Sequence, residues 1–117
     1  RERERLETEL DNFFVIERDG SLIGCAALYP LNETVAEVAC VAIHPDYQGG
    51  DLGDNLLQRL ERHARSQGIS RLAVLTTVAA HWFQEQGFMP AQVSDLPDAR
   101  QALYNYQRAS KVLIKSL

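Results

Sequence analysis

Residues able to do chemistry gather in one segment of the sequence, between Glu37 and Leu60. There an apolar run is followed by the turn Tyr47-Gln-Gly-Gly-Asp-Leu-Gly53 and then by leucines at helical spacing. A glycine-rich turn that opens a helix leaves backbone N–H groups without intrahelical partners, and the helix dipole adds positive potential there. Phosphate groups bind at such positions. The segment therefore predicts either a phosphate-binding turn or a plain connection in which Asp51 caps the helix, and alone it favours neither.

The elements that must position this turn follow from the hydrophobic periodicity of the chain. We expect a mixed α/β domain. The predicted elements begin with the end of a helix over residues 2–11 and two hairpin strands over residues 13–17 and 22–28, joined by Asp19-Gly20. A central strand over residues 37–43, covered on both faces, and a helix over residues 52–64 that Gly68 stops come next. They are followed by a strand over residues 71–75, a short helix over residues 79–86, a strand over residues 88–93, an irregular or helical insertion over residues 97–104, and a final strand over residues 107–117. Because the helix pattern is already under way at residue 2, we expect an earlier strand and helix to precede this chain.

Composition narrows the classes of function. A chain of 117 residues is long enough for one domain and too short for two. The net charge of −4 argues against a nucleic-acid partner, and no apolar stretch approaches the roughly 20 residues of a membrane span. The histidines have no metal-ligand spacing, so no metal is expected. Cys25 and Cys40 are read as reduced thiols of a cytoplasmic protein, although counting alone leaves a disulfide open.

The segment around the turn resembles the acyl-CoA-binding motif of the GNAT superfamily of N-acetyltransferases. In that family an Arg/Gln-x-x-Gly-x-Gly/Ala turn follows a strand and opens a helix that holds the CoA pyrophosphate. Here the match is Gln48-Gly-Gly-Asp-Leu-Gly53, with Asp51 at the usual first glycine; Asp51 and Asp54 are expected near the phosphates. The resemblance implies acetyl-CoA as co-substrate. Its implied binding residues are Cys40, Val41, Ala42, Ile43, Gln48, Gly49, Gly50, Asp51, Leu52 and Gly53.

A longer resemblance covers essentially the whole chain. The matching segments are Cys25-Ala-Ala-Leu28, Glu37-Val-Ala-Cys-Val-Ala-Ile-His-Pro45, Leu75-Thr-Thr77, His81-Trp-Phe-Gln-Glu-Gln-Gly-Phe88 and Leu103-Tyr-Asn-Tyr-Gln-Arg-Ala-Ser-Lys-Val-Leu113, in the order found in bacterial N-acetylglutamate synthases. The resemblance implies a GNAT domain over residues 1–117 that transfers acetyl from acetyl-CoA to L-glutamate, the first step of arginine biosynthesis. It implies that this domain is either the C-terminal part of a longer chain or a truncated domain. It leaves open a homo-oligomer and an N-terminal amino-acid-kinase-like domain.

The resemblance also assigns roles to residues that look ordinary by themselves. An amine attacks a thioester only as the free base, whereas the α-amine of glutamate is mostly protonated at neutral pH. Glu37 resembles the general base of the family, although a strand-end carboxylate in solvent is the better interpretation from the residue alone. Thr76 matches a hydroxyl proposed as the acid, and the N–H of Val41 matches the oxyanion donor. Phe83 stands where many members have a tyrosine, and it cannot donate a proton.

A dicarboxylate substrate needs cationic and polar partners. Arg108 and Ser110 match the substrate-carboxylate residues of the family, Arg1 matches another, and Cys40 is expected to line the same pocket through its backbone. Without the family, a solvated edge strand is the favoured interpretation of Arg108 and Lys111.

Two other functions remain open at this level. One is a GNAT enzyme that acetylates a different acceptor: another amino acid, a polyamine or a protein N-terminus. Arg108 and Ser110 favour an anionic acceptor over a polyamine. The other is a non-catalytic acyl-CoA-binding or regulatory module, weakened by Asp51, by Phe83 and by the missing N-terminal part. An assay of CoA release with glutamate and other amines separates the three.

Overall fold

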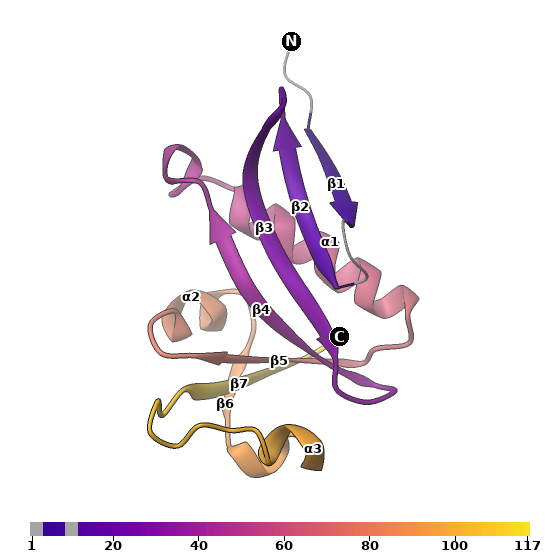
Figure 1. Cartoon of the computed structure of the whole chain (residues 1–117), viewed down its shortest axis with the longest axis vertical. Helices are drawn as coiled ribbons and strands as arrows, with labels where there is room; N and C mark the ends of the chain where they lie inside the picture. Colours follow the sequence, from indigo (N-terminus) through magenta and orange to yellow (C-terminus); the bar gives the residue numbers. More distant parts are fainter. Residues whose placement is uncertain (1–3, 9–11) are drawn as a thin grey trace.

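A computed structural model describes the backbone of residues 4–8 and the whole of residues 12–117. In this part of the chain, seven strands form one mixed sheet in the order β1-β2-β3-β4-β5-β7-β6, with helix α1 lying across one face (Figure 1). The strands are β1 (Glu4–Thr8), β2 (Phe13–Arg18), β3 (Ser21–Pro30), β4 (Val35–Ile43), β5 (Arg71–Thr76), β6 (Met89–Ala91) and β7 (Lys111–Ser116). The helices are α1 (Leu52–Ser66), α2 (Ala80–Glu85) and α3 (Asp98–Gln101), with 3-10 turns η1 (Pro45–Tyr47) and η2 (Val93–Asp95). The predicted mixed α/β class is confirmed.

The N-terminal part of the sheet is a three-stranded antiparallel meander. Asp19 and Gly20 join β2 to β3 with φ angles of 50° and 86°, the left-handed values that a tight hairpin turn requires. Strand β1 pairs with the outer edge of β2, from Glu4 opposite Arg18 to Thr8 opposite Phe14. The predicted helix is therefore wrong for residues 4–8, while residues 2, 3 and 9–11 lie outside the described part. Pairing with an open strand edge outweighs the local i, i+4 pattern, because a helix this short is only marginally stable.

Strands β4 and β5 run side by side for only part of their length. They pair in parallel from Val35 to Val38, and beyond Val38 they diverge (Figure 1). On the other edge of β4 the register with β3 shifts between the pairs Ala27–Ala39 and Cys25–Ala42. Two residues of β4, Cys40 and Val41, therefore face the single residue Ala26, which is a β-bulge. Cys40 has a φ of 54°, so the strand changes direction there. The bulge and the divergence open the sheet at its middle.

The main core lies between the sheet and α1. The predicted helix over residues 52–64 is confirmed, and its leucines pack against apolar side chains of β2 to β5. The largest fully buried side chains of this core are Phe14, Ile16, Ile23, Val38, Leu56, Leu60, Leu72, Phe88 and Leu113. The helix ends at Ser66, and Gly68 follows with a φ of 81°. Burying a leucine of this kind stabilises the fold by about 1.5–3 kcal/mol.

The opposite face of the sheet is only partly covered. The segment around turn η2 covers part of β5 and β7 there, where Leu96 packs with Ala73 and Val112. On β4 this face carries Glu37 and then the exposed residues Cys40 and Ala42. The prediction of a central strand covered on both faces is thus wrong for the second half of β4. Small alanine and cysteine side chains make the run apolar without requiring cover, since each exposes little apolar area.

The C-terminal boundaries are shorter than predicted. Strand β6 covers residues 89–91 of the expected 88–93, and β7 begins at Lys111 although a strand from Gln107 was expected. Before β7, the Asn105 side-chain oxygen accepts the backbone N–H groups of Gln107 and Arg108, at 2.9 and 3.2 Å. These bonds form a side-chain-capped turn, a local alternative that competes with strand pairing.

Candidate functional site

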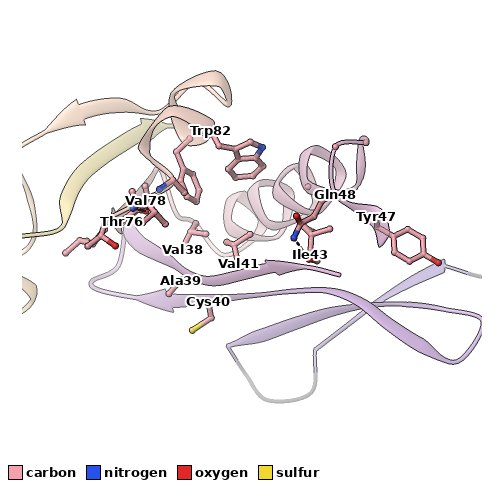
Figure 2. Close-up of a pocket in the computed structure, with 18 of the residues that line it drawn as sticks. Val38, Ala39, Cys40, Val41, Ile43, Tyr47, Gln48, Thr76, Val78 and Trp82 are labelled. Carbon is pink, nitrogen blue, oxygen red and sulfur yellow. Dashed lines mark hydrogen bonds between the residues drawn. The ribbon is translucent and has the colours of Figure 1, made fainter. Parts of the chain in front are cut away.

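The divergence of β4 from β5 creates a cleft of about 780 Å³. One wall is the β4 edge, and the opposite wall is the end of β5 with α2 (Figure 2). The lining residues are Val38, Ala39, Cys40, Val41 and Ile43 from β4, Tyr47, Gln48, Gly49, Gly50 and Gly53 from the turn and α1, Val74, Leu75 and Thr76 from β5, Thr77, Val78 and Ala79 after β5, Trp82 and Phe83 from α2, and Arg108. Because β5 pairing ends at Val38, the backbone of β4 beyond it presents polar groups to a ligand.

The turn before α1 is closed by its own side chains. Gln48 donates its side-chain N–H to the Ile43 carbonyl at 2.9 Å, the bond drawn in Figure 2. Gly49 has a φ of 85°, a conformation that favours glycine. A Cβ on Gly53 would lie 3.1 Å from the Trp82 ring, so this glycine admits Trp82 against the first turn of α1. The turn therefore holds a fixed shape at the start of the helix, beside the cleft.

The two aspartates of the turn do not line the cleft. Asp51 precedes α1 without a capping hydrogen bond from its side chain, and with Leu52 it lines a neighbouring cavity of about 310 Å³. Asp54 accepts a hydrogen bond from the Gln86 side chain at 2.8 Å, so it is directed toward α2. The side-chain cap expected of Asp51 is therefore absent, and the expectation that Asp51 and Asp54 lie near the phosphates stays a prediction.

Glu37 lies on the sheet face opposite α1, because its neighbours Ala36 and Val38 enter the main core. Its carboxylate accepts two hydrogen bonds from Arg100 of α3. The Arg100 Nε lies 2.6 Å from Oε1, and an Nη lies 3.4 Å from Oε2. Sequence reasoning missed Arg100, since 63 residues separate the pair and no local pattern connects them. The interpretation of Glu37 as a carboxylate free in solvent is thereby excluded.

Thr76 lies at the end of β5 and lines the cleft. Its side-chain oxygen accepts the backbone N–H groups of Val78 and Ala79, at 3.3 and 2.9 Å, where the chain turns into α2. A hydroxyl oxygen that accepts these bonds still has its own proton to donate. The geometry thus gives Thr76 a structural role, and its predicted role as acid stays a prediction.

The predicted substrate residues occupy different places. Arg108 lines the cleft, whereas Ser110 lines an adjoining cavity of about 420 Å³ and Arg1 lies outside the described residues. Cys40 lines the cleft, and Figure 2 shows its sulfur pointing away from Trp82, so its backbone faces the cavity. Ala42 is exposed and is not among the lining residues.

Across residues 12–117, histidine, cysteine, aspartate and glutamate side chains form no group of three that could hold a metal ion. None of the described helices combines the length and the apolar character needed to cross a bilayer.

A sheet that splits between two parallel central strands, with a bulge on one and a glycine turn leading from it into a helix, defines an acyl-CoA N-acyltransferase type of fold. Sequence comparison agrees with this class. The model of the family described as "Acetyltransferase (GNAT) family" matches residues 1–88. The chain belongs to the GNAT acetyltransferase family, and the resemblance seen in the sequence is confirmed.

Individual relatives have more specific names than the family. The chain is 57% identical over 118 residues to an amino-acid acetyltransferase of Serratia proteamaculans, covering all of this chain and 27% of that protein. It resembles the N-acetylglutamate synthase of Neisseria gonorrhoeae complexed with coenzyme A and N-acetyl-glutamate, with 40% identity and a TM-score of 0.86 over 91% of this chain and 26% of that one. The same enzyme with coenzyme A and L-arginine gives 41% identity and a TM-score of 0.85, over 100% and 27% of the two chains. The chain thus spans about a quarter of the length of these relatives.

Proposed function

We propose that this chain transfers the acetyl group of acetyl-CoA to the α-amine of L-glutamate, giving N-acetylglutamate and CoA. The observation that carries the proposal is the cleft between β4 and β5, bordered by the bulge at Cys40 and by the glycine turn. Two relatives support glutamate as the amine acceptor. One is an amino-acid acetyltransferase, and the other is an N-acetylglutamate synthase complexed with coenzyme A and N-acetyl-glutamate. The reaction would place the protein at the first step of arginine biosynthesis, in the cytoplasm.

The cleft fits acetyl-CoA in size and in the groups that it offers. A volume of about 780 Å³ lies within the usual range for sites that bury a small ligand. In the proposal, the pantetheine arm pairs with the open edge of β4 from Cys40 to Ile43. The pyrophosphate lies at the turn from Gln48 to Gly53, where the first N–H groups of α1 and its dipole attract anions. Gln86 holds the carboxylate of Asp54 on the α2 side of this helix start, through a hydrogen bond of 2.8 Å.

The proposed chemistry is a direct attack. Glu37, directly or through a water, takes one proton from the protonated acceptor, and the free amine nitrogen then bonds to the thioester carbon. The C–S bond breaks to release CoA thiolate, and the second proton of the nitrogen passes to the thiolate. The bulge changes the direction of the backbone at Cys40, which supports the next N–H, that of Val41, as a donor to the oxyanion. Thr76, at the cleft wall, is the candidate proton donor to the thiolate.

The acceptor would enter from the face opposite α1. Glu37 lies on that face, and Arg108 lines the cleft with a cation suited to a carboxylate. Arg1 and Ser110 remain proposed contacts. A GNAT enzyme with another amine acceptor is the alternative, and the non-catalytic acyl-CoA-binding module is the third possibility.

One assay separates these three. CoA release from acetyl-CoA is measured with L-glutamate, L-aspartate, L-glutamine, spermidine and a peptide N-terminus as acceptors. The proposal predicts the highest kcat/KM with glutamate. A higher kcat/KM with another amine would establish a GNAT enzyme with a different acceptor. CoA binding without acetyl transfer to any of these amines would establish the non-catalytic acyl-CoA-binding module.

The length difference supports a proposal about organisation. Because the chain covers 27% of the Serratia protein, we expect further domains in the complete protein, among them an amino-acid-kinase-like domain, and a homo-oligomeric assembly. Size-exclusion chromatography with light scattering on the complete protein would test the assembly.

A further inference from the structure

We propose that Arg100 is a positioning residue for acetyl transfer, holding the carboxylate of Glu37 in the orientation that it needs to take a proton from the acceptor amine. The inference rests on the proposed function, because it requires Glu37 to act as the base. It adds Arg100 of α3 to the machinery, from a segment that none of the sequence motifs above includes.

The ion pair between Arg100 and Glu37 differs from a solvated surface contact. Its short contact is 2.6 Å, and the side chains are 20% and 13% exposed. By comparison, Arg65 lies 3.8 Å from Glu61 on α1 and is 54% exposed. A guanidinium that donates two roughly parallel hydrogen bonds fixes the plane of the carboxylate as well as its place. Arg100 therefore restricts the rotation of Glu37 in a way that a single contact cannot.

The insertion that carries Arg100 is itself built to hold a fixed shape. Leu96 is 3% exposed and packs beneath the sheet against β5 and β7, anchoring the segment. Gln101 donates its side-chain N–H to the Leu96 carbonyl at 2.7 Å, and the N–H of Arg100 bonds to the Pro97 carbonyl at 2.9 Å. Gln92 and Asp95 cap the preceding turn reciprocally. These bonds set the backbone of Arg100 before any substrate arrives, which is the condition for precise positioning.

The geometry leaves Glu37 able to accept a proton. A carboxylate has roughly four lone-pair sites, and Arg100 engages one site on each oxygen. The remaining sites are available to the amine or to a bridging water. Restricting a reacting group to a productive orientation removes entropy that the transition state would otherwise have to lose. The expected consequence of losing Arg100 is therefore a lower turnover, with little effect on acetyl-CoA.

The test is a double-mutant cycle on Arg100 and Glu37. Arg100→Met, Arg100→Lys, Glu37→Gln and the double variant Glu37→Gln/Arg100→Met are compared, with Arg65→Met as the matched control that removes an arginine from an ion pair away from the cleft. In Arg100→Met we expect kcat to fall about ten- to a hundredfold, the loss that corresponds to charged hydrogen bonds. Arg100→Lys should recover part of this loss, and Arg65→Met should behave as the parent protein. In the Glu37→Gln background, Arg100→Met should add less than about a threefold loss, because residues that act as a unit are not additive.

Several results would overturn the inference. An equal fall in both backgrounds would show that Arg100 acts independently of Glu37. An unchanged kcat with a raised KM for the acceptor would make it a substrate-binding residue instead. CoA titration and thermal unfolding of each variant identify a fold defect, and a loss of kcat explained by unfolding would also overturn it. The parent protein separates the two proposals: transfer to a different amine refutes glutamate while the cycle proceeds with that amine, and transfer to no amine refutes both.

Discussion

At the scale of single residues, the account depends on side chains whose local sequence is unremarkable. Glu37 and Arg108 are a strand residue and a turn residue, and each acquires a role only through the fold. Glu37 lies on the part of β4 that still pairs with β5, next to the cleft-lining Val38, whereas Arg108 lines the cleft itself. Glu37 is withdrawn from solvent by Arg100, and Arg108 borders the cleft. Each therefore makes a separate prediction, one on turnover and one on acceptor binding.

The prediction for Glu37 concerns the proton of the amine. Glu37→Gln should lower kcat by about a hundred- to ten-thousandfold, the usual effect of losing a general base, and should change the acetyl-CoA KM little. Activity should recover in part at high pH, because more of the acceptor is then the free amine. Steady-state kinetics from pH 7 to 10 measure both effects. Comparable turnover of the variant at neutral pH would remove Glu37 from the mechanism.

The prediction for Arg108 concerns the acceptor. Arg108→Lys should raise the glutamate KM about ten- to a hundredfold, because lysine cannot donate two parallel hydrogen bonds to a carboxylate. Acetyl-CoA binding should not change. The control is Arg71→Lys, at an exposed arginine at the start of β5. If the glutamate KM of Arg108→Lys equals that of the control, Arg108 is only a solvated turn residue.

At the scale of elements, a polar network ties α1 and α2 to β7 behind the cleft. Lys115 of β7 donates to Glu61 of α1 at 2.8 Å and to the Gln86 carbonyl after α2 at 2.7 Å. Gln86 in turn donates to Asp54 at 2.8 Å. Glu61 is only 6% exposed, so its charge needs this partner. The network fixes the two helices that contribute to the walls of the cleft.

Removing the central cation of this network should destabilise the fold. Lys115→Met leaves the Glu61 carboxylate buried with only the longer Arg65 contact, and should lower the free energy of unfolding by about 1–3 kcal/mol. Lys111→Met, at an exposed position of the same strand, should change it by less than about 0.5 kcal/mol. Adding Glu61→Leu to Lys115→Met should restore stability, since no charge then stays unpaired. Urea unfolding measures all three, and equal stability of Lys115→Met and Lys111→Met would contradict the role of the network.

A second prediction about the elements concerns Gly53, where the glycine turn meets α1. Gly53→Val should weaken CoA binding, because even a Cβ would lie 3.1 Å from the Trp82 ring, and the larger side chain displaces Trp82 in the cleft. Gly53→Ala requires a smaller shift and should weaken binding less. Calorimetric titration of CoA compares the two. Unchanged affinity in Gly53→Val would show that the cofactor does not use this end of the cleft, and absence of binding to the parent protein at millimolar CoA would refute the site itself.

At the scale of the whole molecule, local patterns were sufficient for some parts of the fold and not for others. The leucine stripe of α1 with Gly68, and Asp19-Gly20 between two apolar runs, predicted a helix and a hairpin that the structure confirms. Strand β1 was mistaken for a helix, because its pairing with β2 is a long-range property. The bulge at Cys40 was missed for the same reason: an apolar run carries no mark of the register that β3 imposes.

The candidate site was likewise predictable from the sequence only in part. The motif around Gln48 and Gly53 indicated a site at the C-terminal end of β4, where the structure has a cleft. It could not show that Gln86 holds Asp54 or that Arg100 holds Glu37, contacts between residues 32 and 63 positions apart. The predicted roles of the individual site residues therefore remain predictions, and the variants above address them.

The central claim is tested most directly by identifying the product under competition. Acetyl-CoA in limiting amount is supplied with an equimolar mixture of the twenty amino acids and spermidine, and the acetylated products are quantified by mass spectrometry. Competing acceptors are used in proportion to their kcat/KM values, so the mixture ranks them in one reaction. The account predicts that N-acetyl-L-glutamate predominates and that Glu37→Gln suppresses it. A different predominant N-acetyl product, or equal glutamate acetylation by the parent and Glu37→Gln, would contradict the account.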